Sequence, residues 1–540
     1  MSRQDGQGTD RSPAPRADVC IVGAGPAGAL VAAELATSGH DVVVLDAGPR
    51  FDPAERTERM ERRIRPAHGP ESVWDMGGER DAFTSEGDMY YPLNAARVKG
   101  IGGTTLHWQG MVYRLHEADF ERRSRDGVTA DWPIGYDDLQ SYYAAAETEL
   151  GVAGADDNPF APPRAEPYPM PAFPPSYSDS IFAEACEALE ITTHSAPNAR
   201  NSEAYDGRVP CQGYGTCKPV CPSGAKYDAT VHVARAEEAG ARVIDRAPVQ
   251  RLEHDDAGDT IEAAVYATPD GEEHRQEARQ FVLAAGGIEI PRLLLLSRSE
   301  QYPDGLANSS GLVGNYFMDH LAARVGGTVD QETRQNHVGF ITTESHQFYD
   351  DGGEARGPFK LEFLNYAGPS PVGEALTSGP EAPWGDGLLD HIRESYGNYL
   401  EVTGLCEQTP QKANRVELNP DVTDDHGNPV PEIHWSIDDR TRRTIEAANE
   451  RQRAIMDELG ADVHWVVGPD STGPAFHHMG TTRMGEDPAE SVVDPECRTH
   501  DLDNCWVASS SVFVTGGALN PTLTIAALSL RVADRLDAEL

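Results

Sequence analysis

Lysine is scarce in this 540-residue chain. Lysine and arginine together number 45 against 88 aspartates and glutamates, so the formal net charge is −43 and the pI is near 4.6. A surface this acidic repels nucleic acid and anionic lipid, and neither is expected as a partner. Arginine supplies most of the positive charge, because the lysines are only Lys99, Lys218, Lys226, Lys360 and Lys412.

The acidic residues are spread along the whole chain rather than gathered in a tail. Acidic tails that bind partners are runs of like charge, so this pattern indicates a general property of the surface. The composition is similar to that of proteins from extremely salt-loving microbes, in which salt screens the repulsion between carboxylates. The alternative is an acidic protein of ordinary salt tolerance.

Long apolar runs are also missing. No stretch approaches the ~20 apolar residues that span a bilayer. Residues 1–16, MSRQDGQGTDRSPAPR, lack the apolar segment of a secretory signal and are expected to be a disordered lead-in. We therefore expect no direct membrane insertion. The expected location is the cytoplasm, or a membrane that the chain reaches through a partner.

A nucleotide-binding pattern opens the ordered part of the chain, which reads DVCIVGAGPAGALVAAELATSGHDVVVLDAG. It predicts a strand at 18–22, a tight glycine turn, a helix to about Ser38 and a second strand at 42–45. Glycines let the backbone approach a pyrophosphate, the helix N-terminus offers free N–H groups, and an acid ~20 residues on accepts ribose hydroxyls. The alternative is a degenerate, empty site. The residues expected to hold a dinucleotide are Gly23, Gly25, Pro26, Ala27, Gly28 and Asp46.

Further glycine-rich segments favour FAD over NAD. The segment KGIGGTTLHWQG (99–110) contains a flexible turn suited to an isoalloxazine ring, and FVLAAGGIEIPRLLLLS (281–297) predicts a strand, a small-residue turn and a helix. A small β-unit, with strands over 261–283, is inserted between them. The additional positions expected to contact FAD are Gly102, Gly103, Thr104, His107, Val249, Ala285, Gly286, Ser510, Asn520 and Thr522.

An apolar helix is predicted directly after Asn520-Pro521-Thr522. Proline is tolerated at the start of a helix, where its missing N–H has no partner to lose. The partial positive charge of the helix N-terminus would stabilise the negative charge of a reduced flavin. The alternative is an ordinary helix of the C-terminal core.

Three cysteines lie within eleven residues, in CQGYGTCKPVCP (211–222). Thiolates are soft ligands that favour iron–sulfur clusters or zinc. The loop has few apolar side chains with which to form a core, although a disulfide with a spare thiol stays an alternative. A cluster passes electrons singly, so a cluster beside a flavin predicts a dehydrogenase with an external acceptor. The expected ligands are Cys211, Cys217 and Cys221, with three- and four-iron clusters both open.

These motifs resemble those of the glucose–methanol–choline (GMC) oxidoreductases, from about residue 17 to the C-terminus. The matching segments are VGAGPAG, GGTTLHW, DWPIGYDDLQSYYAAAE, LAAGGIEIPRLLLLS, GLVGNYFMDH, HHMGTTRMG and NPTLTIAAL. The cysteine loop is similar to that of the catalytic subunits of FAD-dependent glucose, fructose and gluconate dehydrogenases. In that branch a Cys-x5-Cys-x3-Cys loop binds a 3Fe-4S cluster. A cytochrome, or a small accessory subunit, is therefore an expected partner as electron acceptor or escort.

The resemblance implies an α/β fold with a discontinuous, Rossmann-like FAD-binding domain and a substrate domain of antiparallel sheet plus helices. We place the FAD-binding domain at 17–329, with the cysteine loop inserted at 205–228. Residues 330–464 are expected to form mainly the substrate-binding domain, because they lack nucleotide signals. Residues 465–540 return to the FAD-binding domain.

The resemblance also implies the catalytic residues. The family's H-x-x-G-T pattern falls on His477, and its second His or Asn on Asn520. An imidazole can take a hydroxyl proton near neutral pH while hydride leaves for flavin N5. His478 is the rival, and on an extended segment only one of two neighbours can enter the site. His107 precedes Trp108, as in members that attach FAD covalently; packing beside the ring is the alternative.

The leading prediction is a dehydrogenase for an alcohol group of a small hydroxylated substrate, such as a sugar, a sugar acid or a polyol. An oxygen-using alcohol or choline-type oxidase and a redox-neutral lyase or light-driven decarboxylase are alternatives. None of these needs the electron exit that the cysteine loop indicates. An inactive scaffolding subunit is a further alternative, which the His477–Asn520 pair disfavours.

Overall fold

The computed structural model describes residues 10–540 except 65–69, 129, 335–340, 366–382 and 396. Its largest sheet begins with the predicted strand–helix–strand unit, in which Gly39 (φ +96°) follows the helix. The three strands in the order β7, β2, β1 run parallel, and β10 continues the sheet beyond β1. The bounds are β1 Ala17–Val22, α1 Pro26–Thr37, β2 Val42–Leu45, β7 Arg242–Ile244 and β10 Glu273–Leu283.

Strand β10 joins two kinds of sheet, because its eleven residues have different partners along their length. Its first half pairs antiparallel with β9, which pairs with β8. Its second half lies parallel to β1 and to β18, so that Val282 pairs with both Ile21 and Trp506. The β-unit predicted between the flavin segments is thus an antiparallel extension of the parallel sheet. The bounds are β8 Val249–His254, β9 Ile261–Ala267 and β18 Cys505–Val507.

Helices from both ends of the chain cover the parallel strands. Helix α1 packs against α9 and α14, and α14 packs against α7. The N-termini of α1, α10 and α14 all border one cavity. The bounds are α7 Tyr136–Leu150, α9 Thr230–Glu238, α10 Gly286–Leu296 and α14 Thr522–Glu539.

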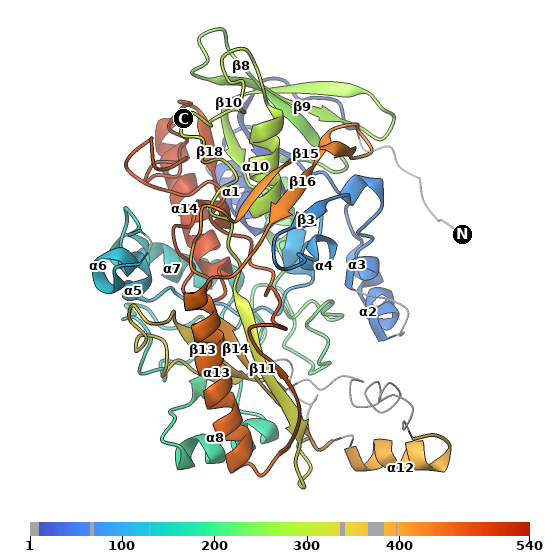
Figure 1. The fold of residues 1–540 in the computed structure, drawn as a ribbon. Helices are drawn as coiled ribbons and strands as arrows, with labels where there is room; N and C mark the ends of the chain where they lie inside the picture. The colour runs from blue at the N-terminus through green and yellow to red at the C-terminus, as the bar shows by residue number, and fades with distance from the viewer. Residues whose placement is uncertain (1–9, 65–69, 129, 335–340, 366–382, 396) are drawn as a thin grey trace.

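A second sheet of six strands has the order β17-β11-β14-β13-β12-β6, and all its pairs are antiparallel. Helix α13 lies along it and packs against β11, β13 and β14 (Figure 1). Separate hydrophobic cores underlie the two sheets. The bounds are β6 His194–Ser195, β11 Leu321–Thr328, β12 Thr343–Ser345, β13 Phe359–Phe363, β14 Tyr399–Cys406, α13 Asp439–Glu458 and β17 Asp462–Val467.

The expected boundary between 329 and 330 does not follow the sheets. Strand β11 precedes it but pairs with β14 and β17 of the six-stranded sheet. Strands β15 (Arg415–Thr423) and β16 (Pro429–His434) follow it, yet both pack on α10, and β16 pairs with β3 (Thr84–Glu86). Strand pairing between distant segments, which no local pattern encodes, decides where each segment belongs.

The disordered lead-in expected over 1–16 does not extend over 10–16; residues 1–9 lie outside the described part. Arg11 binds Asp245 at 2.8 Å, and the backbone N–H of Ala14 donates to Gln276 at 2.9 Å. Residues expected to belong to a solvated tail therefore make tertiary hydrogen bonds. Among the described residues, no helix is both long and apolar enough to cross a membrane.

Candidate active site

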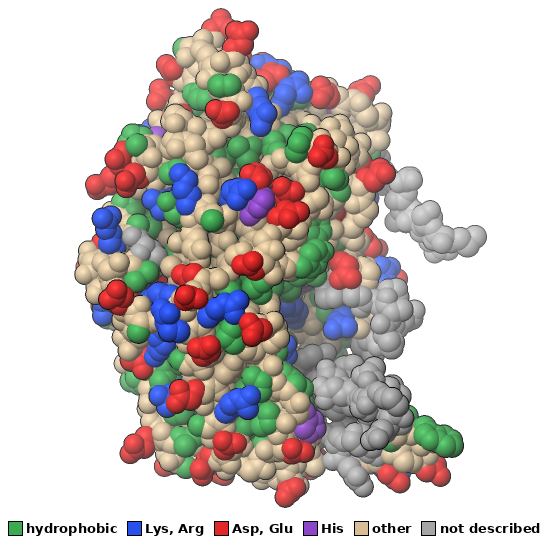
Figure 2. All heavy atoms as spheres, in the orientation of Figure 1, with side chains coloured by type: hydrophobic (Ala, Val, Ile, Leu, Met, Phe, Trp, Pro, Cys, Tyr) green, Lys and Arg blue, Asp and Glu red, His purple; other side chains and the backbone are tan. Residues whose placement is uncertain are grey.

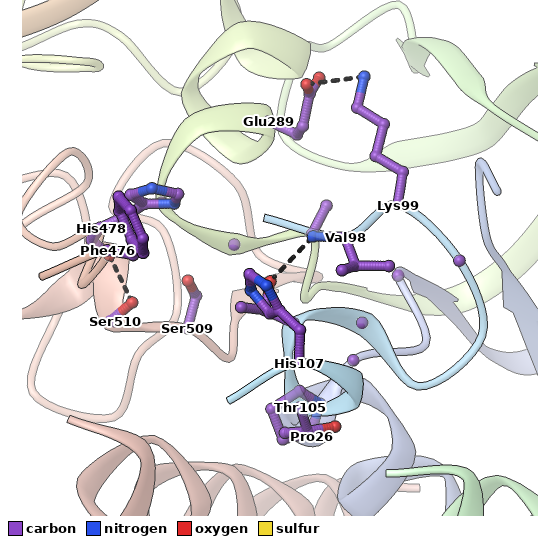
Figure 3. Close-up of a pocket in the computed structure, with 18 of the residues that line it drawn as sticks. Pro26, Val98, Lys99, Thr105, His107, Glu289, Phe476, His478, Ser509 and Ser510 are labelled. Carbon is purple, nitrogen blue, oxygen red and sulfur yellow. Dashed lines mark hydrogen bonds and ion pairs between the residues drawn. The ribbon is translucent and has the colours of Figure 1, made fainter. Parts of the chain in front are cut away.

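One cavity of about 1200 Å³ is lined by residues of both sheets' domains. Figure 3 shows part of its wall, with His107 and the Lys99–Glu289 ion pair facing the same space as His478 and Ser510. All but two of the positions predicted to bind FAD line this cavity. They are Gly23, Gly25, Pro26, Ala27, Asp46, Gly103, Thr104, His107, Val249, Ala285, Gly286, Ser510, Asn520 and Thr522.

The two exceptions, Gly28 and Gly102, shape the cavity from behind. A Cβ on Gly28 would lie 2.0 Å from the carbonyl oxygen of Gly23, so only glycine lets α1 sit this close to the turn. Gly102 adopts φ +104°, a left-handed conformation that glycine tolerates. A Cβ on Gly103 would lie 2.8 Å from the Cα of Gly25, so the two predicted glycine turns touch each other.

The α1 end of the cavity fits the pyrophosphate of FAD. Helix α1 begins at Pro26 without a side-chain cap, so its first backbone N–H groups remain available to an anion. Asp46 is held by two backbone donors, Ala24 N at 2.8 Å and Gly48 N at 2.9 Å. Burial raises the pKa of Asp46 even against these donors. The predicted ribose-binding carboxylate thus borders the cavity in a fixed orientation.

His107 is 3 % exposed and borders the cavity. Burial, with the nearby Lys218 and Lys226 ammonium groups, lowers the pKa of His107 to about 3. The ring is therefore neutral at neutral pH, which is the nucleophilic form of imidazole. Both a covalent bond to FAD and simple packing against it suit this position, and the linkage stays a prediction.

Hydrogen bonds assign the proton of His477. Nε2 of His320 lies 3.1 Å and 2.9 Å from the carbonyl oxygens of Gly516 and Gly517, which can only accept, so Nε2 carries a proton. Burial lowers the pKa of His320 to about 4, so the ring is neutral and its Nδ1 is an acceptor. Nδ1 of His477 lies 2.8 Å from it and must donate. His477 therefore keeps the free electron pair on Nε2.

That free pair faces Asn520. Nε2 of His477 and Nδ2 of Asn520 are 3.4 Å apart, and both residues border the cavity. Burial, His320 and Lys360 together hold the pKa of His477 well below its ordinary value. The two residues predicted as catalytic are thus brought together, with an unprotonated nitrogen toward the space that a substrate would enter.

His478 also lines the cavity, so the expectation that only one of the two histidines can enter is wrong. Alternation of side chains holds in a strand, whereas this segment bends at Phe476, whose φ is +74°. The His478 ring packs against Tyr91 with centroids 5.6 Å apart, and its Nε2 has no hydrogen-bond partner. Burial lowers the pKa of His478 to about 3. His477, in contrast, makes hydrogen bonds with both Asn520 and His320, whereas His478 makes neither of them.

Asp319 fixes the backbone that carries His477. Its carboxylate accepts the N–H of His477 at 2.8 Å and that of Phe476 at 3.1 Å, as well as the hydroxyl of Tyr91. Burial raises the pKa of Asp319 to about 7 despite these donors. His477 is therefore anchored through both its ring and its main chain.

Sequence reasoning missed three groups around this pair: His320, Lys360 and Lys218. His320 ends the segment GLVGNYFMDH, which carried the family resemblance, but nothing local linked it to a ring 157 positions away. The scarcity of lysine was the available signal for the other two. Lys360 is 0 % exposed and reaches Asn520, and Lys218 borders the cavity over the Phe476 ring at 4.7 Å.

The cysteine loop contributes Lys218 to the cavity wall. Nζ of Lys226 donates to the carbonyl oxygens of Leu106 at 3.3 Å, Trp108 at 2.5 Å and Cys217 at 2.9 Å. These bonds join the loop to the segment that carries His107. Burial lowers the pKa of Lys226 to about 8, against the opposing effect of the Cys221 and Cys217 sulfurs.

The positions of the sulfur atoms bear on two alternatives for the loop, a disulfide and a zinc site. All eight cysteines of the chain are free, so the structure contains no disulfide there. A single zinc ion would hold its sulfurs roughly 4 Å apart, with bonds of about 2.3 Å. In the described part of the chain, the metal-ligand groups converging within 4.8 Å do not include Cys211, Cys217 and Cys221. A cluster would spread its thiolates over several irons, and a cluster on this loop stays a prediction.

The chain matches known proteins over nearly its full length. Residues 92–322 and 410–529 match two family models described as GMC oxidoreductase, and residues 18–147 match a model described as FAD dependent oxidoreductase. The fructose dehydrogenase large subunit of Gluconobacter japonicus is 35 % identical over 96 % of this chain and 97 % of that protein. The chain belongs to the GMC oxidoreductase family.

Two further comparisons agree with this assignment. The 2-methyl-1,2-propanediol dehydrogenase of Mycolicibacterium austroafricanum is 31 % identical over 96 % of this GMC chain and 95 % of that protein. The solved structure of an Aspergillus oryzae formate oxidase variant superposes with a TM-score of 0.67 at 16 % identity, covering 98 % of this chain and 99 % of that one, which shows the fold. The GMC chain is an FAD-dependent oxidoreductase that acts on CH–OH groups, and it has the predicted α/β fold with a Rossmann-like FAD-binding domain.

Proposed function

We propose that this enzyme is a dehydrogenase that oxidises an alcohol group of a sugar, a sugar acid or a polyol and passes the electrons to an external acceptor. The observation that carries the proposal is the free electron pair on His477 Nε2, which faces Asn520 at the wall of the FAD cavity. The names of the two relatives, a fructose dehydrogenase subunit and a propanediol dehydrogenase, support a hydroxylated substrate.

In the proposed reaction His477 takes the hydroxyl proton of the substrate on Nε2. Its Nδ1–H stays bonded to His320, so the ring does not rotate as its charge changes. Asn520 donates an N–H to the substrate oxygen and holds it beside the base. Bound FAD supplies a two-electron acceptor for the hydride at N5. The N-terminus of α14, at Thr522, directs its partial positive charge into the same cavity.

For the electron exit we propose a 3Fe-4S cluster on Cys211, Cys217 and Cys221. Lys226 supports this position, because it bonds both the loop and the His107 segment of the cavity wall. A cluster carries one electron at a time, so two successive transfers through it would reoxidise a flavin that had accepted a hydride. The external acceptor we propose is a cytochrome, which a small accessory subunit could accompany.

The proposed substrate and acceptor are tested together. The purified protein is mixed anaerobically with a panel of sugars, sugar acids and polyols, and the flavin absorbance is followed. We expect one class to bleach the flavin and an artificial dye to restore it much faster than air does. Reoxidation by oxygen as fast as by dye would identify an oxidase, and conversion of a substrate without bleaching would identify a redox-neutral reaction.

The cluster is tested on anaerobically isolated protein. We expect about three irons per chain with matching acid-labile sulfide, and an EPR signal that reduction removes. Cys217→Ser should lose iron because a hard hydroxyl replaces a soft thiolate poorly. Substrate should still bleach the flavin of this variant, whereas cytochrome reduction should fail. The matched control is Cys186→Ser, a buried thiol of the second core, which should keep its iron. Zinc, or no metal, in the parent protein would contradict the cluster.

A further inference from the structure

Lys360 is a fully buried cation next to the proposed catalytic pair. It lies on β13 and is 0 % exposed, and its Nζ is 3.1 Å from Glu344 Oε2 and 2.7 Å from Glu362 Oε1. The ammonium also sits over the ring of Tyr113, 3.7 Å from its centroid. Burying a charge is costly unless it is paired, and here two carboxylates pair it. The third polar partner is Asn520, whose Oδ1 accepts from Nζ at 3.3 Å.

Glu344 forms an ion pair with this lysine and is itself held by a second hydrogen bond. Its Oε2 also accepts the hydroxyl of Tyr113 at 2.7 Å. Burial alone would raise the pKa of Glu344, but the Lys360 ammonium, His346 and His194 together outweigh burial and hold the pKa below its ordinary value. The carboxylate therefore stays charged and keeps the ammonium in place.

The same carboxylate belongs to a group of metal-ligand type, His194, Glu344 and His346, whose ligand atoms lie within 4.8 Å of one another. Hydrogen bonds disfavour a cation there. Asn158 accepts the N–H of Phe160 on Oδ1 at 2.9 Å, so its Nδ2 faces Nδ1 of His346, 3.2 Å away. The proton of His346 is then on Nε2, which lies 3.4 Å from Glu344 Oε1, so this nitrogen has no electron pair for a metal.

Lys360 decides which end of the Asn520 amide faces the base. An ammonium can only donate, so it attracts Oδ1 of Asn520 and leaves Nδ2 toward Nε2 of His477. The opposite orientation would direct Oδ1 at the free pair of His477 and Nδ2 at the ammonium, placing two acceptors and two donors against each other. We propose that Lys360 is a positioning residue that holds Asn520 with its N–H toward the base and the substrate oxygen. This inference rests on the proposed roles of His477 and Asn520.

A double-mutant cycle tests the proposal. Lys360→Met, Asn520→Ala and the double variant are compared with the parent protein by anaerobic flavin reduction. If Lys360 acts through Asn520, Lys360→Met should slow reduction by up to about 10²-fold, with a smaller effect on KM. It should add nothing to Asn520→Ala, because the group that it orients is gone. The matched control is Lys412→Met, the same change at an exposed lysine, which should leave the rate unchanged.

The pH profile separates positioning from a structural role. Removal of the cation should raise the pKa of His477, so the acid limb of flavin reduction should move to higher pH in Lys360→Met. A structural defect alone would lower the rate without moving this limb. The titratable groups that act on His477 besides Lys360 are His320, His478 and Lys218. Asp319 accepts the backbone N–H of His477, and this variant retains all four groups.

A readout without FAD accompanies the kinetics. Thermal unfolding of the four apoproteins should show non-additive shifts in Tm for the two substitutions. If Lys360→Met fails to fold because Glu344 loses its partner, Lys360→Met/Glu344→Gln removes both charges together and takes its place.

The outcomes distinguish failure of the positioning role from failure of the proposed function. If Lys360→Met slowed flavin reduction by the same factor in the parent protein and in the Asn520→Ala variant, the positioning role would be overturned. An unmoved acid limb with additive Tm shifts would do the same. A normal reduction rate in Asn520→Ala would instead remove Asn520 from the proposed function, and the role of Lys360 with it.

Discussion

At the scale of single residues, burial and hydrogen bonds distinguish two adjacent histidines of the same chemistry. His477 has its proton assigned by His320 and its free pair directed at Asn520. His478 packs against Tyr91, and its Nε2 has no partner. A general base needs a free pair beside the proton that it takes, so contact with Asn520, rather than presence in the cavity, separates the two.

We expect His477→Ala to slow flavin reduction by about 10²–10⁴-fold, because the proton acceptor is lost. FAD should remain bound, since the glycine turns that border the cavity are untouched. His478→Ala is the matched control and should retain most activity. The measurement is anaerobic single-turnover bleaching, with FAD content determined on the same samples. Greater damage from His478→Ala would reverse the assignment.

The pH dependence of the reaction follows from the environment of His477. Its pKa is held well below the ordinary 6.5 by burial, His320 and Lys360, so the base stays unprotonated as the pH falls through 6.5. The rate of flavin reduction should therefore stay level through that region and decline only in more acidic solution. The decline should reverse when the pH is restored. An inflection near 6.5 that His477→Ala abolishes would show a solvated imidazole instead.

At the scale of elements, backbone contact between turns builds the cavity. The β1–α1 turn touches the turn at Gly103, and α10 and α14 direct their N-termini at the same space. Such contacts leave no room for side chains. The turn between β15 and β16 also borders the cavity, and there Arg292 of α10 bonds Asp424 at 2.6 Å. The cavity is thus assembled from segments spread over most of the chain.

Gly28→Ala should remove FAD and destabilise the protein by about 1–3 kcal/mol, because its Cβ would lie 2.0 Å from the backbone oxygen of Gly23. Gly387→Ala is the control, since a Cβ there meets nothing within 4 Å. Flavin content and thermal unfolding measure both effects. Full FAD occupancy in Gly28→Ala would mean that the α1 turn relaxes without consequence.

At the scale of the whole molecule, the net charge of −43 dominates. Figure 2 shows acidic side chains scattered over the face drawn there, with basic side chains between them. The carboxylates of such a surface repel one another over a distance that shortens as the salt concentration rises. The Debye length is about 30 Å at 0.01 M and about 3 Å at 1 M. Repulsion therefore acts across much of the molecule at low salt and only between neighbours at high salt.

We expect the melting temperature to rise with salt between these limits, and dialysis to low salt to cause unfolding or loss of FAD. Thermal unfolding followed by flavin fluorescence at several concentrations of potassium chloride measures this. A melting temperature that does not change would assign the composition to an acidic protein of ordinary salt tolerance.

Much of this protein was predictable from its sequence because the information is local. The pattern over 18–45 predicts a strand, a helix and a second strand, and β1, α1 and β2 match it closely. Glycines at turns, proline before a helix and an acid after a strand act through their own backbone conformation and immediate neighbours. Such motifs, in a shared order, also sufficed to identify the family and the FAD cavity.

Tertiary structure alone decided the contacts between segments far apart in the chain. The pairing of β11 with β17, the entry of both His477 and His478 into one cavity, and the bonds of Arg11 to Asp245 have no local signature. The same holds for the contact of Lys360 with Asn520, 160 positions apart. The physical reason is that a buried polar group must find its partner wherever the fold brings one, and sequence spacing does not encode that position.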